Sequence, residues 1–178
     1  MAASLTGQLL VAEPALLDPN FRRTVVLVCD HDEDGAFGLV LNRPTEHKLS
    51  DALEESFSFE TELWQGGPVQ LDTLHFLHTH GAAIDGATEV LDGVFWGGSF
   101  ESLVAQAGTE PPARFFAGYA GWSAGQLDEE LEAGGWLVHP ATARTVLDPD
   151  ATLWRRILRS LGGEYALLAN FPDNPRMN

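Results

Sequence analysis

A possible catalytic nucleophile lies at Ser123, within the segment Gly-Trp-Ser-Ala-Gly at residues 121–125. This Gly-x-Ser-x-Gly pattern is typical of serine hydrolases, which place the serine on a turn between a strand and a helix. The serine also needs a histidine base and an acid, and in that enzyme class both follow it in the chain. His139 does follow, but no acid lies between the two at the usual spacing. A convergent arrangement could instead use a preceding histidine, namely His75, His78 or His80. Hydrolysis by Ser123 therefore stays as an alternative.

Ser123 has a simpler interpretation as the N-cap of a helix. A serine hydroxyl at that position accepts a hydrogen bond from an amide of the first turn. Gln126 stands three positions further on and would complete a capping box. Leu127 and Leu131 follow at the spacing of a buried helix face. The sequence thus favours capping over catalysis, and we predict no catalytic residue here.

The acidic segment at residues 30–35 begins like a calcium-binding loop. Asp30, Asp32 and Asp34 alternate and are followed by Gly35. The twelfth position of such a loop should be a bidentate glutamate, whereas this chain has Leu41. We therefore predict an exposed hairpin turn in which Gly35 supplies a positive φ angle.

Histidines are densest at His75, His78 and His80. From a strand, His78 and His80 would point the same way, as paired metal ligands do. A third ligand would have to come from elsewhere in the chain. We interpret the three as polar residues at the end of a strand, and we predict no metal and no other cofactor.

Glycines at residues 97 and 98 precede Ser99, at the predicted start of a helix. Amides at such a position can hold an anion, but tight turns explain the pair equally well. The spacing matches neither the nucleotide-binding pattern Gly-x-x-x-x-Gly-Lys nor Gly-x-Gly-x-x-Gly. We predict a turn.

The charge of the chain is strongly acidic. Lysine and arginine number 10 and aspartate and glutamate 26, which gives a net charge of −16. Such a field repels nucleic-acid phosphates and anionic membranes. The main basic cluster is Arg155, Arg156 and Arg159, and we interpret it as a solvated helix face whose Arg159 complements the helix dipole. Direct DNA binding through these arginines is the alternative.

Cys29 is the one cysteine, so no intramolecular disulfide forms. It lies among valines in a predicted strand, where burial would make the thiol inert. Together with the absence of an apparent leader or a long apolar segment, this predicts a protein of the reducing cytoplasm.

The pattern of apolar residues predicts a single domain over residues 1–178, of the α+β class with a mixed sheet. Residues 21–30 are apolar on both faces, as in a strand covered on both sides. The predicted strands are residues 8–12, 21–30, 37–41, 73–78, 89–96, 113–120 and 136–138. The predicted helices are residues 49–55 with Ser50 as N-cap, 99–107, the helix capped by Ser123, a mostly helical segment after Pro140, and a last helix from Asp150 to Leu161.

Several short motifs occur in an order that resembles the bacterial AlgH/YqgE family. They are Pro-Asn-Phe-Arg-Arg-Thr-Val-Val at residues 19–26, Gly-Leu-Val-Leu-Asn-Arg-Pro at 38–44, Gly-Gly-Pro-Val at 66–69, Leu-His-Thr at 77–79, Gly-Tyr-Ala-Gly-Trp at 118–122, Gly-Gln-Leu at 125–127 and Trp-Leu at 136–137. The resemblance spans nearly the whole chain. It implies a compact fold with a strongly bent, barrel-like sheet flanked by helices, and a soluble bacterial protein. The family is often labelled a transcriptional regulator, from a link to alginate production.

The leading functional prediction is a non-enzymatic binding or regulatory module that acts through a protein partner or a small ligand. Any effect on transcription would then be indirect. In the predicted site, Arg43 presents a bidentate anion contact and Trp122 stacks on a planar group. The predicted site residues lie on the motif loops and are Asn42, Arg43, Pro44, Gly66, Gly67, Pro68, Tyr119, Trp122, Gly125 and Gln126. An equal alternative is that these loops only close the fold.

Overall fold

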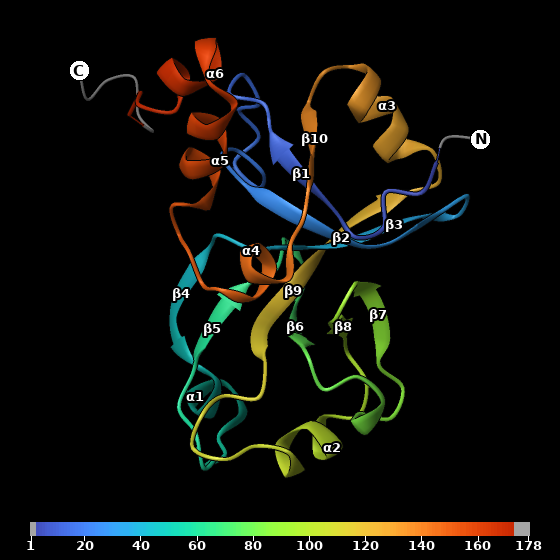
Figure 1. The fold of residues 1–178 in the computed structure, drawn as a ribbon, viewed down its shortest axis with the longest axis vertical. Coiled ribbons are helices and arrows are strands. Elements are labelled where there is room, and N and C mark those ends of the chain that lie inside the picture. Colours follow the sequence, from blue (N-terminus) through green and yellow to red (C-terminus); the bar gives the residue numbers. More distant parts are fainter. Residues whose placement is uncertain (1–2, 173–178) are drawn as a thin grey trace.

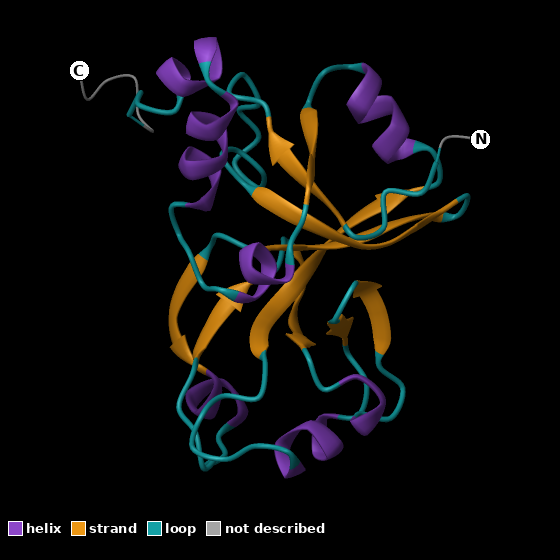
Figure 2. Ribbon diagram, in the orientation of Figure 1, coloured by secondary structure: helices purple, strands orange, loops and turns teal. Residues whose placement is uncertain are grey.

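The fold is built on a mixed sheet with helices around it (Figures 1 and 2). The computed structural model describes residues 3–172, and within them the sheet has 10 strands. These are β1 (Gln8–Ala12), β2 (Val25–Asp32), β3 (Gly35–Val40), β4 (Pro44–Lys48), β5 (Glu62–Gln65), β6 (Val69–His78), β7 (Thr88–Leu91), β8 (Val94–Trp96), β9 (Arg114–Ser123) and β10 (Trp136–Pro140). The helices are α1 (Leu49–Leu53), α2 (Phe100–Ala105), α3 (Gln126–Glu132), α4 (Ala143–Leu147), α5 (Leu153–Leu161) and α6 (Gly163–Leu168), with a 3-10 turn at Gly81–Ala83.

The strands follow the order β10-β1-β2-β3-β9-β6-β8-β7, with β4 and β5 on a branch. Among the described strands every pairing is antiparallel except that of β5 with β9. The predicted α+β class and mixed sheet are confirmed. The sheet is not a closed barrel, because its path ends at β10 and at β7. No helix within residues 3–172 is long and apolar enough to cross a membrane.

Strand β9 is where the sheet divides, and it runs through both halves of the molecule in Figure 1. Its C-terminal part pairs antiparallel with β3, from Ala120 to Ser123. Its N-terminal part pairs parallel with β5, from Phe115 to Ala117. Gly118 separates the two parts and has a φ of +71°. A single strand thus serves two different neighbours along one edge, because its backbone turns at this glycine.

The division requires a close crossing of two backbones. A Cβ atom on Gly67 would lie 2.1 Å from the carbonyl carbon of Tyr119, and one on Gly66 would lie 2.4 Å from the carbonyl oxygen of Gly118. Gly66 also bridges the two neighbours, because its amide donates to Ala117 at 2.8 Å and its carbonyl accepts from Val40 at 2.7 Å. Only residues without a side chain fit this crossing.

Two apolar clusters fill the two halves of the sheet. The larger lies around β1, β2, β3 and β10 and includes the buried residues of α3, α4 and α5. The smaller is rich in phenylalanine and lies under α1 and α2. The prediction that β2 is covered on both faces is confirmed, since its residues Val25 to Cys29 are all buried.

Several predicted boundaries are wrong. Residues 21–23 form a turn, because Arg23 has a φ of +55° and cannot extend the strand. Residues 89–96 form a hairpin instead of one strand, turning at Gly93 with a φ of +79°. Lys48, and not Ser50, is the N-cap of α1. Thr152 holds that position in α5 in place of Asp150. The sequence patterns missed β4, β5 and α6.

We expect Gly118→Ala to destabilise the fold far more than Gly134→Ala. The two glycines have nearly the same φ, +71° and +77°, but a Cβ at Gly118 would lie 2.7 Å from the Gly67 oxygen, whereas space is open at Gly134. The left-handed backbone alone costs an alanine about 1 kcal/mol, and the added strain at Gly118 raises the loss to about 3 kcal/mol. Urea denaturation measures both losses. Equal losses would show that the crossing tolerates a side chain.

Candidate functional site

The predicted site residues fall into two groups. The first group lies around the backbone crossing, where the Gln65 amide donates to the Arg43 carbonyl at 2.9 Å. It contains Asn42, Arg43, Pro44, Gly66, Gly67, Pro68 and Tyr119. The second group lies at the end of β9 and the start of α3, and contains Trp122, Gly125 and Gln126.

Most of the first group supports the fold. Gly66 and Gly67 are buried in the crossing. Pro44 is exposed and pairs with Trp64 at the start of β4. Pro68 is half-buried ahead of β6. Tyr119 stacks on Phe37, with ring centroids 4.6 Å apart.

Asn42 and Arg43 fasten the loop that precedes β2 to the end of β3. The Asn42 side chain accepts from the Val25 amide at 2.9 Å and donates to the Arg23 carbonyl at 2.9 Å. The Arg43 guanidinium donates to the backbone carbonyls of Pro19, Asn20 and Arg22. Burial lowers the pKa of Arg43, while the nearby charge of Asp18 partly restores it.

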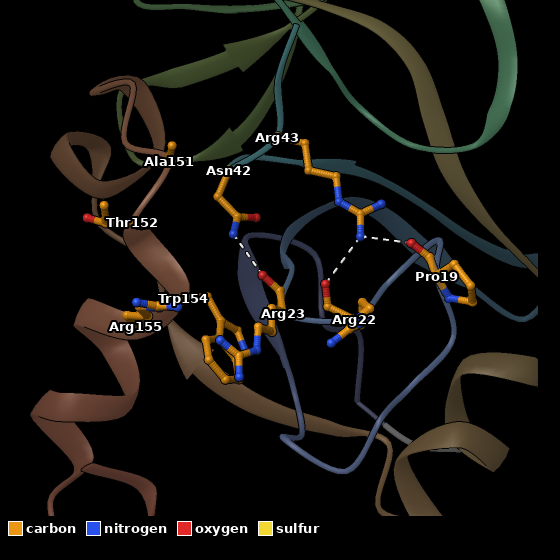
Figure 3. Close-up of a pocket in the computed structure, with 9 residues that line it drawn as sticks. All are labelled: Pro19, Arg22, Arg23, Asn42, Arg43, Ala151, Thr152, Trp154 and Arg155. Carbon is orange, nitrogen blue, oxygen red and sulfur yellow. Dashed lines mark hydrogen bonds between the residues drawn. The ribbon is translucent and has the colours of Figure 1, made fainter. Parts of the chain in front are cut away.

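Beside these two residues lies a cavity of about 550 Å³, shown in Figure 3. Residues after β3 and before β2 form one side, and the start of α5 forms the other. Its lining residues are Pro19, Arg22, Arg23, Asn42, Arg43, Ala151, Thr152, Trp154 and Arg155. Four arginines thus line one cavity in a chain with 10 basic residues. None of the lining residues is acidic, so the cavity is an anion-binding candidate.

Arg23 and Arg155 differ in how far their contacts hold them in the fold. Arg23 lies over the Trp154 ring at 4.9 Å, and its Nη2 donates to the carbonyls of Phe171 at 2.9 Å and Pro172 at 3.1 Å. Arg155 is half-buried in the first turn of α5. Within residues 3–172 it has no hydrogen bond or ion pair. Its guanidinium is the one least committed to holding the fold.

Arg114 differs from the arginines of this cavity in being almost completely buried. It is 6% exposed, and its guanidinium lies near the rings of Trp64 at 4.8 Å and Phe116 at 4.9 Å. It donates to the carbonyls of Leu41 and Val146, which joins β3 to α4. Burial lowers its pKa to about 10, although Asp148 and Asp150 oppose the shift.

The second group is organised by Glu130 of α3. One carboxylate oxygen accepts from the indole N–H groups of Trp122 and Trp136, each at 2.9 Å. The other accepts from the Gln126 side chain at 2.9 Å. Trp122 is 6% exposed and packs against Phe21 and Trp136. The hypothesis that Trp122 stacks on a ligand is therefore not supported, because the protein covers its ring.

Ser123 is not the N-cap of α3. Gly125 holds that position with a φ of +77°. Half of the predicted capping box is present, because the Gln126 side-chain oxygen accepts from the Ser123 amide at 3.0 Å. The Ser123 hydroxyl also donates to that oxygen at 3.2 Å. No histidine among residues 3–172 is hydrogen-bonded to Ser123.

The histidines bind separate partners. His75 contacts the Thr73 hydroxyl at 3.1 Å, while His78 and His80 contact the carbonyls of Gly97 and Pro112, each at 2.9 Å. The rings of His78 and His80 do lie face to face, 5.8 Å apart. Burial lowers the pKa of His75 and His78. Within the described part of the chain, no three histidines, cysteines or acids are placed to hold a metal.

The remaining candidate motifs are accounted for by local structure. The predicted hairpin is present, but its turn is confined to residues 33–34, where the Asp34 amide donates to Asp32 at 2.8 Å. Ser99 caps α2 by accepting from the Ser102 amide, as predicted. On α5, Arg156 pairs with Asp150 at 2.9 Å and Arg159 donates to Asn170.

The mixed sheet and its surrounding helices place the chain among α+β proteins. The model of the AlgH-like family matches residues 9–166. The chain belongs to the AlgH-like family, as the sequence motifs indicated.

Relatives and solved structures agree with this assignment. A UPF0301 protein of Chlorobaculum tepidum is 49% identical over 177 residues, covering 97% of this chain and 95% of the relative. The solution structure of the Pseudomonas aeruginosa AlgH protein is similar with a TM-score of 0.75 and 30% identity, covering 98% of this chain and 97% of that one. A crystal structure of a Corynebacterium diphtheriae protein has a TM-score of 0.77 and 25% identity, covering 96% and 94%.

The sequence reasoning found Asn42 and Arg43 but missed their neighbours in the cavity. Arg22 and Arg23 were visible only as part of a family motif, and Arg155 was interpreted as part of a solvated helix face. The chain is poor in basic residues, so the two adjacent arginines at residues 22–23 were the sequence feature that could have indicated this cavity.

We expect Glu130→Ala to destabilise the protein by about 2–4 kcal/mol, because two buried indole N–H groups lose a charged acceptor. Glu129→Ala on the exposed side of the same helix is the control and should change stability by less than about 0.5 kcal/mol. Urea denaturation followed by tryptophan fluorescence measures both. Similar values for the two variants would contradict the assigned role of Glu130.

We also expect Cys29 to resist thiol reagents in the native protein. It is 2% exposed, and burial, with a smaller effect of Asp30, raises its thiol pKa. Labelling by a disulfide reagent should therefore proceed only as fast as the protein unfolds. Rapid labelling of the folded protein would instead show that the Cys29 thiol is accessible in the native state.

Proposed function

We propose that the chain is a non-enzymatic binding or regulatory module that recognises an anionic group at the arginine-lined cavity. The group belongs to a small ligand or to a protein partner. The observation that carries the proposal is the gathering of four arginines in one cavity of a chain with a net charge of −16.

Guanidinium groups placed together repel each other, and an anion between them offsets this repulsion because it attracts both. Arg43 is held by three backbone carbonyls, which orient its guanidinium but carry no formal charge. Arg155 has no such contact within residues 3–172. Arg43 therefore brings an oriented positive charge to the cavity and Arg155 an uncompensated one, which supports anion recognition.

The alternatives have less support. Hydrolysis by Ser123 would need a base, and the partner of its hydroxyl is the neutral amide of Gln126. Direct DNA binding by α5 would need three arginines on one accessible face, yet Arg156 is paired with Asp150 and Arg159 contacts Asn170. An effect on transcription would accordingly pass through a partner or a ligand.

We expect at least one anion from a small panel to bind at the cavity. Citrate, pyrophosphate and a hexaglutamate peptide are titrated at low ionic strength while the amide, indole and arginine Nε signals are followed by nuclear magnetic resonance. Saturable shifts should be confined to residues around Arg43 and Arg155. Arg155→Gln should weaken binding about tenfold or more, since charge-assisted hydrogen bonds are lost.

Arg144→Gln is the matched control. Arg144 is 91% exposed on α4, pairs with Asp148 and does not line the cavity. Its loss should leave anion affinity unchanged. Equal weakening by both variants would mean that only the overall charge matters, and no binding by any anion would refute the proposed function.

A further inference from the structure

We propose that the anion recognised at this cavity is a phosphate dianion, either free phosphate or the phosphate group of a small molecule. This inference rests on the proposed function and makes it more specific. Three properties of the cavity lead to it: the directions from which its donors come, its size, and the charge of the surface around it.

The donors approach from separate segments of the chain. Arg22 and Arg23 precede β2, Arg43 follows β3, and Arg155 belongs to α5. In Figure 3, Arg43 lies on one side of the cavity and Arg155 on the other. The acceptor sites of a carboxylate lie close to one plane, whereas the tetrahedrally arranged terminal oxygens of a phosphate accept donors from several directions. The spread of arginines therefore favours phosphate.

The start of α5 adds to this preference. Ala151, Thr152, Trp154 and Arg155 line the cavity, so the first turn of the nine-residue helix faces it. A helix N-terminus carries partial positive charge. At this one the Thr152 amide already donates to the Asp150 carboxylate at 2.8 Å, which offsets part of that charge. By itself such a terminus indicates nothing, but here it lies beside guanidinium groups from two other segments.

The size of the cavity indicates a small ligand. Its volume of about 550 Å³ lies within the range of about 300–1,000 Å³ that is typical of small-molecule sites. The Trp154 ring is not available to stack on a base, because Trp154 is 2% exposed and the Arg23 guanidinium lies over it.

The surrounding charge disfavours a nucleic acid. A polyanion would extend beyond the cavity onto a chain with a net charge of −16. Two arginines outside the cavity are already paired with acids, since Arg156 pairs with Asp150 and Arg144 pairs with Asp148. A small phosphate ligand keeps its charge within the arginine cluster and avoids this repulsion.

The residues of the cavity allow the ionisation of the ligand's phosphate group to be followed through the pH dependence of binding. No histidine lines the cavity. The acids nearby are Asp18, close to Arg43, and Asp150, close to Thr152. For Asp150, burial raises the pKa, but hydrogen bonds from Thr152 and Arg156 outweigh burial and lower it. Asp150 thus stays ionised above pH 5.5.

The test measures the affinity of ribose 5-phosphate, inorganic phosphate, sulfate, malonate and a 20-nucleotide single-stranded DNA by titration calorimetry. The second proton of a phosphate group leaves with a pKa of about 6. If the dianion is the bound form, the affinity for ribose 5-phosphate should rise about fourfold from pH 5.5 to 7.5. Sulfate keeps its charge over this range, so its affinity should stay constant.

The competing outcomes are distinct. Binding of malonate as tight as that of ribose 5-phosphate, or a phosphate affinity independent of pH, would overturn the phosphate assignment and leave the proposed function standing. Tighter binding of the DNA would overturn it in favour of a nucleic acid. Failure of every anion would refute the proposed function as well.

Two further comparisons complete the experiment. Inorganic phosphate binding as tightly as ribose 5-phosphate identifies free phosphate as the ligand, whereas weaker binding identifies a phosphorylated molecule. Arg155→Gln should lower the ribose 5-phosphate affinity about tenfold, and Arg144→Gln should not. Should Arg155→Gln fold poorly, signal shifts in the unaltered protein that lie outside the cavity would overturn the assignment.

Discussion

The close crossing of residues 66–67 over strand β9 is the constraint on which the structure depends. With no side chains at Gly66, Gly67 and Gly118, the two backbones approach closely enough for Gly66 to hydrogen-bond to both Ala117 and Val40. Strand β9 can then pair with β3 along one part and β5 along the other. The two apolar clusters lie on the two halves that this division creates.

The crossing also determines one wall of the candidate site. The Val40 amide is bound to Gly66 and the Arg43 carbonyl to Gln65, so residues 40–43 have a fixed path. Asn42 and Arg43 then hold the loop before β2, where Arg22 and Arg23 are found. Helix α5 supplies the opposite wall and is anchored by the Trp154 indole, which donates to the Ala12 carbonyl at 2.8 Å. The cavity is therefore a product of three packed segments.

Arginines in this protein serve two purposes that burial distinguishes. Arg114 is enclosed by aromatic rings and carbonyls, and burial lowers its pKa to about 10. Its guanidinium joins two elements by donating to the carbonyls of Leu41 and Val146. Arg155 is half-buried at a cavity, and its side chain has no hydrogen bond or ion pair within residues 3–172. This difference distinguishes the cation of the core from the cation of the candidate site, and residue type alone does not reveal it.

The sequence by itself determined the family, the α+β class, the buried strand β2 and the hairpin at residues 30–35. These follow from local apolar patterns and from motifs in a fixed order. Both can be recognised without knowing which distant residues are in contact. The tertiary structure decided the rest. Ser123 lies in a strand because β9 continues along β3, Trp122 is covered because Glu130 and Phe21 pack on it, and Arg22, Arg43 and Arg155 meet only after folding. A site formed by segments more than a hundred residues apart depends on long-range packing, which no local pattern contains.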